Sequence, residues 1–311
     1  MYEDFSYVDA LVDDLSVAEL RVLVAVDGEA SVSAAGVRLG LTQSAVSHAL
    51  RAAEKKMGAV LFQRGRGGAR ATPAGNAAVG HARRILRLIE VMKVDTHIAA
   101  RGEVTGTIRV AAFRSAAFHL LPRVLVRFGQ RYPKVTVTVR IVPDLGRGVA
   151  GEVADGRADV GMVSLPVYVD GLVTKELYAE PYLLAYPEGH PDPRSLPLID
   201  WHENCAGETR RWLARQEWIP PGDITVEDDG VVMSMVGHGL GAAIVPRLST
   251  VGAPAKVATA ELGDDAPQRH VGYVTTPELA GSAIIRDLLG ELRAMKGVAG
   301  PPAVEPAAGR E

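Results

Sequence analysis

The sequence predicts a multidomain protein in which a small all-α domain with a winged helix-turn-helix is followed by a long helix and an α/β domain. Three observations predict this architecture. Residues 41–57 have the apolar spacing of an amphipathic helix with a polar front. Thr72-Pro73 begins an apolar stripe that continues for roughly 27 residues. From Thr107 onward, strand patterns alternate with helix patterns.

The helix predicted over residues 41–57 has a small apolar back and a front of short polar or cationic side chains. Thr42 stands at its N-cap, where a hydroxyl accepts from unpaired backbone amides. The apolar positions are Ala45, Val46, Ala49, Leu50, Ala53 and Met57, and the front carries Gln43, Ser44, Ser47, His48 and Arg51. A helix of this kind fits the major groove of double-stranded DNA, where base edges differ in donors and acceptors. An ordinary surface helix is the alternative for this segment alone.

The flanking segments favour DNA binding. A short helix predicted over Ser33–Leu39 ends at Gly40, and a tight turn then leads into the polar-fronted helix. This is the helix-turn-helix arrangement, whose second helix enters the groove. Downstream, a glycine-rich turn carries Arg64, Arg66 and Arg70, which predicts a basic wing over phosphate.

Charge is clustered in this part of the chain. The whole protein has a net charge of −3, which by itself argues against a nucleic-acid partner. Residues 31–93, however, contain eleven Lys and Arg against only two acids, Glu54 and Glu90. Such clustering, rather than the global sum, is typical of a DNA-binding protein.

From about residue 15 to residue 75 the chain resembles the DNA-binding domain of the LysR-type transcriptional regulators. The resemblance rests on SAAGVRLGLTQSAVSHALRAAEKKMG, on LFQR, and on TPAG at the start of a long helix. The departures are apolar packing changes at Ala30, Val32, Ala53, Met57 and Ala71. We expect the DNA-binding residues to be Ser31, Ser33, Thr42, Gln43, Ser44, Ser47, His48, Arg51, Arg64, Arg66 and Arg70.

The composition limits the classes of protein to consider. A chain of 311 residues predicts two or three domains, and no apolar run is long enough to span a membrane. The acidic N-terminus lacks the order of a signal peptide, which predicts a cytoplasmic protein. The single cysteine, Cys205, fits a reducing compartment; a redox-sensing thiol is the alternative to a plain small side chain.

The long helix predicted over residues 73–100 has one apolar stripe, which must be buried against something. The stripe consists of Val79, Ala82, Ile85, Leu88, Ile89 and Met92. In the resembled family this linker helix pairs antiparallel with a second copy, so the resemblance implies a homodimer, and a homotetramer through the α/β domains. Packing on its own domain is the alternative.

Beyond a hinge at residues 101–106, a βαβαβ pattern begins a doubly wound sheet. Strands are predicted at 107–112, 135–142, 158–164, 181–187, 197–200, 224–228, 241–246 and 269–275. Helices are predicted at 118–132, 148–156, 209–218, 229–237 and 277–296.

This part of the chain resembles the effector-binding domain of the same family, which is similar to periplasmic binding proteins. The resemblance implies two α/β lobes with a small-molecule effector in the cleft between them. The predicted division is an acidic extension (1–14), a DNA-binding domain (15–72), the linker helix, the hinge, an effector domain (107–297) and a disordered tail (298–311). Lobe one would comprise 107–166 and 268–297, and lobe two 167–267.

An effector is expected beyond the carboxyl ends of the strands, where helix N-termini point. The candidate residues are Arg114, Ser115, Ala116, Ser164, Trp201, His202 and Asp228. Ser115 falls where the family places a small hydroxyl residue that touches effector. Arg114 is suited to a carboxylate-bearing effector, although a solvated surface arginine explains it equally well.

Other function classes explain less of the chain. We find no nucleotide-binding glycine fingerprint, no metal-ligand spacing among the eight histidines and no serine nucleophile elbow, so no enzyme, metal or cofactor is predicted. A solute-binding module of a transport system would leave the helix-turn-helix unexplained. A general chromosome-coating protein would leave the α/β cleft without a purpose. An effector-responsive, sequence-specific DNA-binding transcriptional regulator accounts for every segment.

Overall fold

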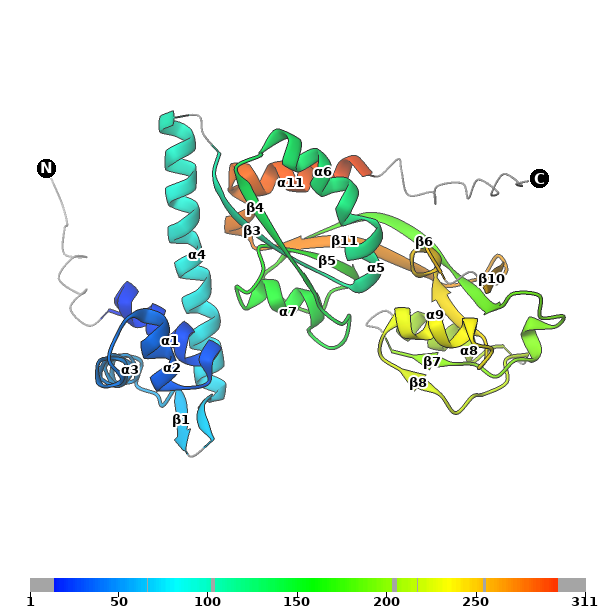
Figure 1. Ribbon diagram of the computed structural model, residues 1–311, viewed down its shortest axis with the longest axis horizontal. Helices are drawn as coiled ribbons and strands as arrows, with labels where there is room; N and C mark the ends of the chain where they lie inside the picture. The colour runs from blue at the N-terminus through cyan, green and yellow to red at the C-terminus, as the bar shows by residue number, and fades with distance from the viewer. Residues whose placement is uncertain are drawn as a thin grey trace, which may run out of the picture. The chain divides into compact units, whose positions relative to one another are not determined.

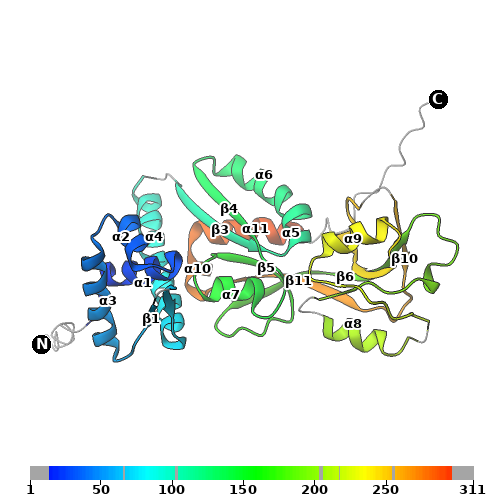
Figure 2. The same cartoon turned by 60° about the horizontal axis from the view of Figure 1, so that its bottom comes forward.

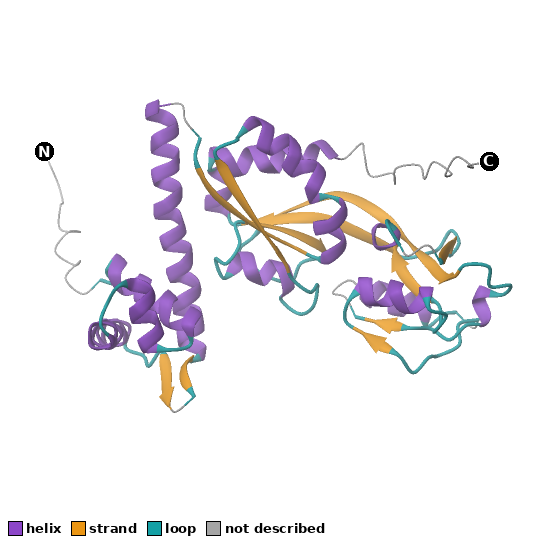
Figure 3. Cartoon of the chain, in the orientation of Figure 1, coloured by secondary structure: helices purple, strands orange, loops and turns teal. Residues whose placement is uncertain are grey.

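The computed structural model describes residues 14–65, 67–101, 104–202, 206–216, 218–253 and 256–295. The chain forms two compact units, residues 1–93 and 94–311, and each is described by itself. Helices dominate the first unit, and strands covered by helices make up the second (Figure 3). Most of the predicted acidic extension, the predicted tail, Arg66 and Cys205 lie outside the described residues.

The first unit begins with three helices, drawn in blue in Figure 1. The helices are α1 (Val17–Glu29), α2 (Val32–Leu39) and α3 (Gln43–Met57). Ser16 and Glu19 form a capping box at the start of α1, because each side chain bonds the other residue's backbone N–H. Lys56 of α3 donates to the Glu19 carboxylate at 2.9 Å, which ties α3 to α1. The core between the helices includes Leu23, Val26 and Leu50, all fully buried.

A β-hairpin and a long helix complete this unit. Strands β1 (Phe62–Gly65) and β2 (Gly68–Ala71) pair antiparallel and lead into α4 (Pro73–Arg101), a helix of 29 residues. The Thr72 hydroxyl accepts from the Gly75 N–H at 3.0 Å and donates to the Val60 carbonyl at 2.8 Å. A side chain at Gly75 would come within 1.9 Å of the Leu61 carbonyl oxygen, so only glycine permits this close packing.

The described part of the second unit contains a seven-stranded mixed sheet in the order β10-β6-β11-β5-β3-β4, with β9 paired to β6. Its strands are β3 (Gly106–Ala112), β4 (Val135–Ile141), β5 (Val160–Leu165), β6 (Val173–Pro187), β9 (Ala243–Pro246), β10 (Val257–Glu261) and β11 (Gln268–Thr275). Strand β3 lies parallel to β4 and β5, whereas β11 runs antiparallel to β5 and β6. Two short strands, β7 (Asp200–Trp201) and β8 (Thr225–Val226), pair separately.

The second unit consists of two lobes, and helices cover the strands in each of them. They are α5 (Arg114–His119), α6 (Leu121–Arg131), α7 (Gly148–Ala154), α8 (Ala206–Leu213), α9 (Asp229–Gly237), α10 (Pro277–Gly281) and α11 (Ala283–Ala294), with 3-10 turns η2 (Pro193–Ser195) and η3 (Arg247–Thr250). In lobe one, α6 and α11 lie on one face of the sheet and α7 on the other (Figure 1). In lobe two, α8 and α9 lie on opposite sides of the strands (Figure 2).

The fifteen-residue strand β6 connects the lobes. Its first half pairs with β11 in lobe one, and its second half pairs with β9 and β10 in lobe two. The sheet of lobe one therefore takes in residues 173–180, which the sequence placed in lobe two. Each lobe has its own apolar core, around Val153 in lobe one and around Val236 and Trp212 in lobe two.

Several element boundaries differ from the predicted ones. The helix expected over 118–132 is two helices that meet at Leu120, because Pro122 has no N–H to continue the ladder from α5. The helix expected over 277–296 is interrupted at Ser282, whose extended backbone caps α11. Strand β10 and the first half of β6 were not predicted.

Among the described residues, no helix is both long and apolar enough to cross a membrane. The same residues contain no group of three or more His, Cys, Asp or Glu side chains arranged to hold a metal ion.

Candidate DNA interface and ligand cleft

Helices α2 and α3 are joined by a tight turn that sets the angle between them. Gly40 ends α2 with a φ of 68°, a left-handed conformation that glycine adopts without strain. A side chain at Gly36 would come within 2.8 Å of the Leu41 carbonyl oxygen, so the helix and the turn pack with backbone in contact. The arrangement is a helix-turn-helix with α3 as its second helix.

One face of α3 is available to a partner. Val46, Leu50 and Ala53 are fully buried, whereas the polar front of α3 points outward. Gln43, Ser44, His48 and Arg51 are exposed, and Ser47 is half-buried beside them. This face combines hydroxyl, amide, imidazole and guanidinium groups over about two turns, the donors and acceptors that base edges can pair with.

Three predicted DNA-binding residues also have structural tasks. Thr42 caps α3, since its hydroxyl oxygen accepts from the Ala45 N–H at 3.2 Å and lies 3.0 Å from the Ser44 hydroxyl. Ser31 caps α2 by accepting from the Ala34 N–H at 3.3 Å. Arg64 of the hairpin pairs with Glu54 of α3 at 3.2 Å. Ser33 is exposed in the first turn of α2.

Glu54 fixes the hairpin to α3, a function that sequence reasoning missed. One carboxylate oxygen accepts from the N–H groups of Leu61 and Phe62, and the other pairs with Arg64. Arg64 stands opposite the buried Ala69 and Arg70 opposite Gln63, so the two arginines project from opposite faces of the hairpin. The usable signal was that Glu54 is one of only two acids among residues 31–93.

Internal ion pairs neutralise part of the positive charge of this unit. Arg38 pairs with Glu29, Lys56 with Glu19, and Arg83 with Asp27. By contrast, Arg51, Lys55 and Arg70 are exposed and make no ion pair with any residue that the structure describes. The exposed face of α3 and the hairpin therefore carry positive charge that these internal ion pairs do not neutralise.

The apolar stripe of α4 divides into two parts. Val79 and Ala82 are fully buried in the core of the first unit and are not available to a partner. Ile85, Leu88 and Met92 are exposed by 44%, 38% and 60%, and Ile89 is half-buried. The exposed part of the predicted dimer stripe is thus shorter than the sequence suggested, because the start of α4 belongs to the winged domain.

The second unit has a cleft where the ends of β3, β4, β7 and β8 meet. Its volume is about 70 Å³. It is lined by Phe113, Arg114, Ile141, Val142, Pro143, Asp144, Trp201, His202, Glu227, Asp228, Asp229 and Arg269. Four of the predicted effector residues, Arg114, Trp201, His202 and Asp228, line this cleft together.

Ser115, Ala116 and Ser164, also predicted as effector residues, are not part of the cleft lining. Ser115 and Ser164 are 2% and 3% exposed, and Ala116 is fully buried. Burial therefore keeps these three side chains out of the cleft. The Ser115 hydroxyl lies behind it, 3.5 Å from the Ser249 hydroxyl of lobe two and 3.3 Å from Arg269. The lining also includes residues that were not predicted, because no local pattern in the sequence marks them: Phe113, 141–144, Glu227, Asp229 and Arg269.

An ion pair joins the two lobes across the cleft. The Arg114 Nε of lobe one lies 2.8 Å from Asp228 and 3.8 Å from Asp229 of lobe two. Asp228 also caps α9 by accepting from the Gly230 and Val231 N–H groups at 3.0 and 3.2 Å. The pair is partly exposed, so its strength depends on whether water or a ligand fills the cleft.

Behind the cleft, a buried polar network links both lobes to the connecting strands. Arg269 of β11 binds Glu180 of β6 through two hydrogen bonds of 2.9 and 2.7 Å, and both side chains are at most 5% exposed. Arg269 also donates to the Ser115 hydroxyl at 3.3 Å. Burial, reinforced by the Glu180 charge, raises the pKa of Tyr178 far above its usual value. This network holds β11, β6 and α5 together on the side of the cleft where β6 passes between the lobes.

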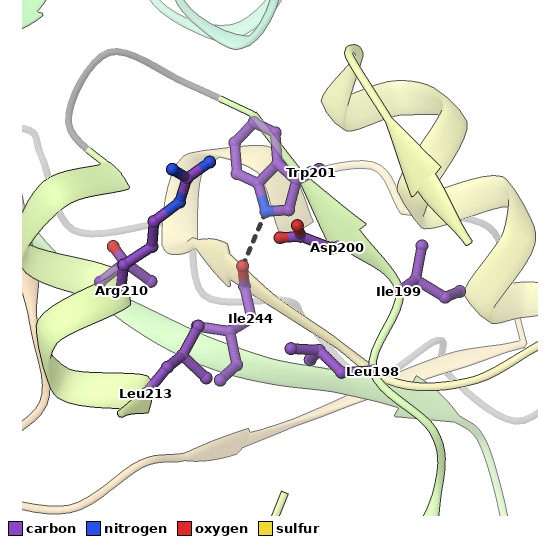
Figure 4. A pocket seen from close by; sticks show the side chains of 8 residues that line it. Leu198, Ile199, Asp200, Trp201, Arg210, Leu213 and Ile244 are labelled. Carbon is purple, nitrogen blue, oxygen red and sulfur yellow. Dashed lines mark hydrogen bonds between the residues drawn. The ribbon is translucent and has the colours of Figure 1, made fainter. Parts of the chain in front are cut away.

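Trp201 lines the cleft and also a second, smaller hollow beside α8, which Figure 4 shows. Its indole N–H donates to the Ile244 carbonyl at 2.8 Å, and this bond fixes the orientation of the ring. Leu198, Leu213 and Arg210 line the hollow beside it. The side chain therefore lines both hollows and also packs against the apolar core of lobe two.

Comparison with known proteins gives two family matches. Residues 17–76 match the bacterial regulatory helix-turn-helix protein, lysR family, and residues 101–296 match the LysR substrate binding domain. The chain is 35% identical over 260 residues to a probable HTH-type transcriptional regulator LrrA of Synechococcus elongatus, covering 80% of this chain and 86% of LrrA.

The chain is also similar to solved structures. A full-length OxyR variant from Pseudomonas aeruginosa has a TM-score of 0.69 at 20% identity, with coverage of 90% of this chain and 98% of OxyR. Full-length CbnR in complex with its target DNA has a TM-score of 0.63 at 21% identity, with coverage of 90% and 99%. At these identities the likeness concerns the fold.

Proposed function

The chain belongs to the LysR family of transcriptional regulators, and from this premise we propose how it binds DNA and responds to an effector. Two recognition helices α3, one from each subunit of a dimer, enter successive major grooves about 34 Å apart. The observation that carries the proposal is the exposed polar face of α3 on an apolar, fully buried back.

Base recognition is assigned to the front of α3. Gln43, Ser47 and Arg51 follow one another at spacings of four residues, so they lie along one side of the helix. Ser44 and His48 stand beside them at the same spacing. Arg51 and Gln43 reach furthest and are suited to paired hydrogen bonds with guanine and adenine, respectively.

Phosphate contact is assigned to Arg70 and Arg64 of the hairpin, and to Arg66, which follows β1 in the sequence. Arg70 is supported best, because it is exposed and lacks an ion pair to any described residue, whereas Arg64 is held by Glu54. Each phosphate contact releases counterions from DNA, so the affinity is expected to fall steeply with salt.

The exposed part of the α4 stripe supports pairing with a second copy of the chain. Ile85 and Leu88, with Met92 one turn further, present apolar surface that is unusual on a helix in water. We propose a homodimer through this stripe, and association of two dimers through the second units.

The cleft between the lobes is the proposed effector site. Arg114 and Asp228 belong to different lobes, so a ligand that changes their pairing also changes how the lobes approach each other. A ligand shifts this equilibrium only if it binds one lobe arrangement more tightly than the other. That shift would alter the spacing of the recognition helices and the bend of the DNA.

Fluorescence anisotropy on the DNA upstream of the protein's own gene, against scrambled DNA across a salt series, tests the proposal. We expect tighter binding to the upstream DNA. Arg70→Ala should weaken binding to both DNAs alike and reduce the slope of log K against log salt by about 0.9. Arg211→Ala, an exposed arginine of the second unit, is the matched control. An unchanged slope for Arg70→Ala, or no preference between the DNAs, would contradict the assignment.

A further inference from the structure

We infer that the effector carries a positively charged nitrogen, as an amine or a guanidinium, bound by the acidic wall of the interlobe cleft. This inference rests on the proposed function, in which the cleft is the effector site. It differs from the carboxylate-bearing effector that Arg114 alone had suggested, because the structure reveals what surrounds Arg114.

The lining of the cleft is acidic. Four carboxylates line it, those of Asp144, Glu227, Asp228 and Asp229, against two guanidinium groups. With histidine taken as neutral, the lining has a formal excess of two negative charges. A cleft lined by one sign of charge attracts ligands of the opposite sign, because its low-dielectric walls concentrate the field.

The two arginines of the lining are already engaged. Arg269 is 2% exposed and binds the buried Glu180 carboxylate twice, so its charge is matched inside the protein. Arg114 is bound by Asp228 at 2.8 Å, with Asp229 at 3.8 Å. An anionic ligand would have to displace Asp228 from Arg114 while facing the remaining carboxylates. A cation can instead pair with the exposed Glu227 and leave the Arg114–Asp228 pair in place.

Asp229 indicates where the positive charge is most useful. The residue is 8% exposed, and its carboxylate accepts from the Ser249 hydroxyl at 2.8 Å, with Arg114 more distant. Burying a carboxylate is costly unless a cation or several donors balance it. A ligand nitrogen in the cleft would add its positive charge to that of Arg114, which lies 3.8 Å from the Asp229 carboxylate.

The remaining lining suits the rest of such a ligand. Trp201 offers an aromatic ring whose orientation is fixed by the hydrogen bond to Ile244, and cations bind favourably over indole faces. Val142 and Pro143 supply apolar surface for a short carbon chain. The small volume of about 70 Å³ favours a compact ligand.

Titration calorimetry of the full chain with two small probes of opposite charge tests the inference. Putrescine, a four-carbon diamine, and succinate, a four-carbon dicarboxylate, are similar in length and differ in the sign of their charge. We expect putrescine to bind with an affinity that falls as salt is raised, and succinate not to bind. Glu227→Gln should weaken putrescine about threefold, as expected for one partly screened charge pair. Glu188→Gln, an exposed glutamate outside the cleft, should leave the affinity unchanged.

Preferential binding of succinate, or binding of neither probe, would overturn the inference. Equal loss of putrescine affinity in the Glu227→Gln and Glu188→Gln variants would do the same, because the cation would then be attracted by overall charge. Anisotropy on operator DNA, run on the same preparations, keeps the two conclusions apart. Retained operator binding with no response to putrescine would reject the cationic effector and leave the DNA-binding proposal standing.

Discussion

The two candidate sites of this protein are built in opposite ways. The DNA interface is exposed and basic, and its residues come from one segment of about forty residues, Ser31–Arg70. The ligand cleft is recessed and acidic, and its lining comes from residues 113–114, 141–144, 201–202, 227–229 and 269. On the polar front of α3, Gln43, His48 and Arg51 are exposed. In the cleft, by contrast, Arg114, Asp228 and Arg269 are held by ion pairs.

This contrast teaches where substitutions should act. At an exposed face such as that of α3, removing a side chain changes what the protein binds and leaves its fold intact. In the cleft, the groups that would contact a ligand are continuous with the buried network of Glu180 and Arg269, so binding and stability are coupled there. Four substitutions test the contrast, from the largest expected effect to the smallest.

Arg269→Met should destabilise the second unit by about 3–5 kcal/mol, because it leaves the Glu180 carboxylate buried without its cation. Denaturant unfolding followed by tryptophan fluorescence measures this, since all three tryptophans lie in that unit. The double variant Arg269→Met with Glu180→Leu should recover most of the loss. If Arg269→Met alone were as stable as the parent protein, the stability of the second unit would not depend on the buried ion pair behind the cleft.

Ser47→Ala should reduce the preference for operator over scrambled DNA by about 1 kcal/mol, the typical contribution of one hydrogen bond. Alanine has a higher helix propensity than serine and Ser47 is only half-buried, so the unfolding transition should not shift to lower stability. Anisotropy with both DNAs separates the two properties. An equal loss of affinity on both DNAs would show that Ser47 does not read sequence.

Ala30→Gly should stabilise the first unit by about 0.5–1 kcal/mol. Ala30 ends α1 with a φ of 48°, a left-handed conformation that costs an alanine about 1 kcal/mol and a glycine almost nothing. Part of the gain is offset by the greater freedom of glycine in the unfolded chain. Thermal unfolding followed by circular dichroism measures the change, with Ala77→Gly in α4 as a control expected to destabilise. A lower melting temperature for Ala30→Gly would refute the strain at this position.

The smallest effect is expected from the acid titration of Glu19. Burial raises the pKa of this carboxyl, but hydrogen bonds from Ser16 and Lys56 outweigh burial and lower it below the usual 4.5. Because the folded-state pKa is depressed, this contribution is fully present above about pH 4.5 and is lost as pH falls through the folded pKa. Glu19→Gln should therefore make the melting temperature of the first unit less dependent on pH below about 4.5. A parallel pH dependence of parent and variant would exclude the effect.

The sequence predicted the helices near the DNA interface more accurately than the strands and the cleft of the second unit. Helix α3 and the beginning of α4 at Pro73 were predicted closely, because caps and apolar spacing are local signals. The first half of β6 and all of β10 were not predicted, because their sequences have no clear alternation of apolar and polar residues. These segments become strands by pairing with β11 and with the second half of β6, respectively. In the cleft, the ends of strands identified Arg114 and Trp201, but nothing in the sequence brought Asp229 or Arg269 to them.

The sequence by itself determined the family, the order of the domains and the polar front of the recognition helix. These follow from residues a few positions apart, whose spacing and capping act within one helix or one turn. Only the tertiary structure decided that Glu54 holds the hairpin, that Val79 and Ala82 belong to the first unit's core, and that the cleft is acidic. These properties depend on which side chains meet across large sequence separations, and burial and pairing at those meeting points set both the charge and the exposure of each group.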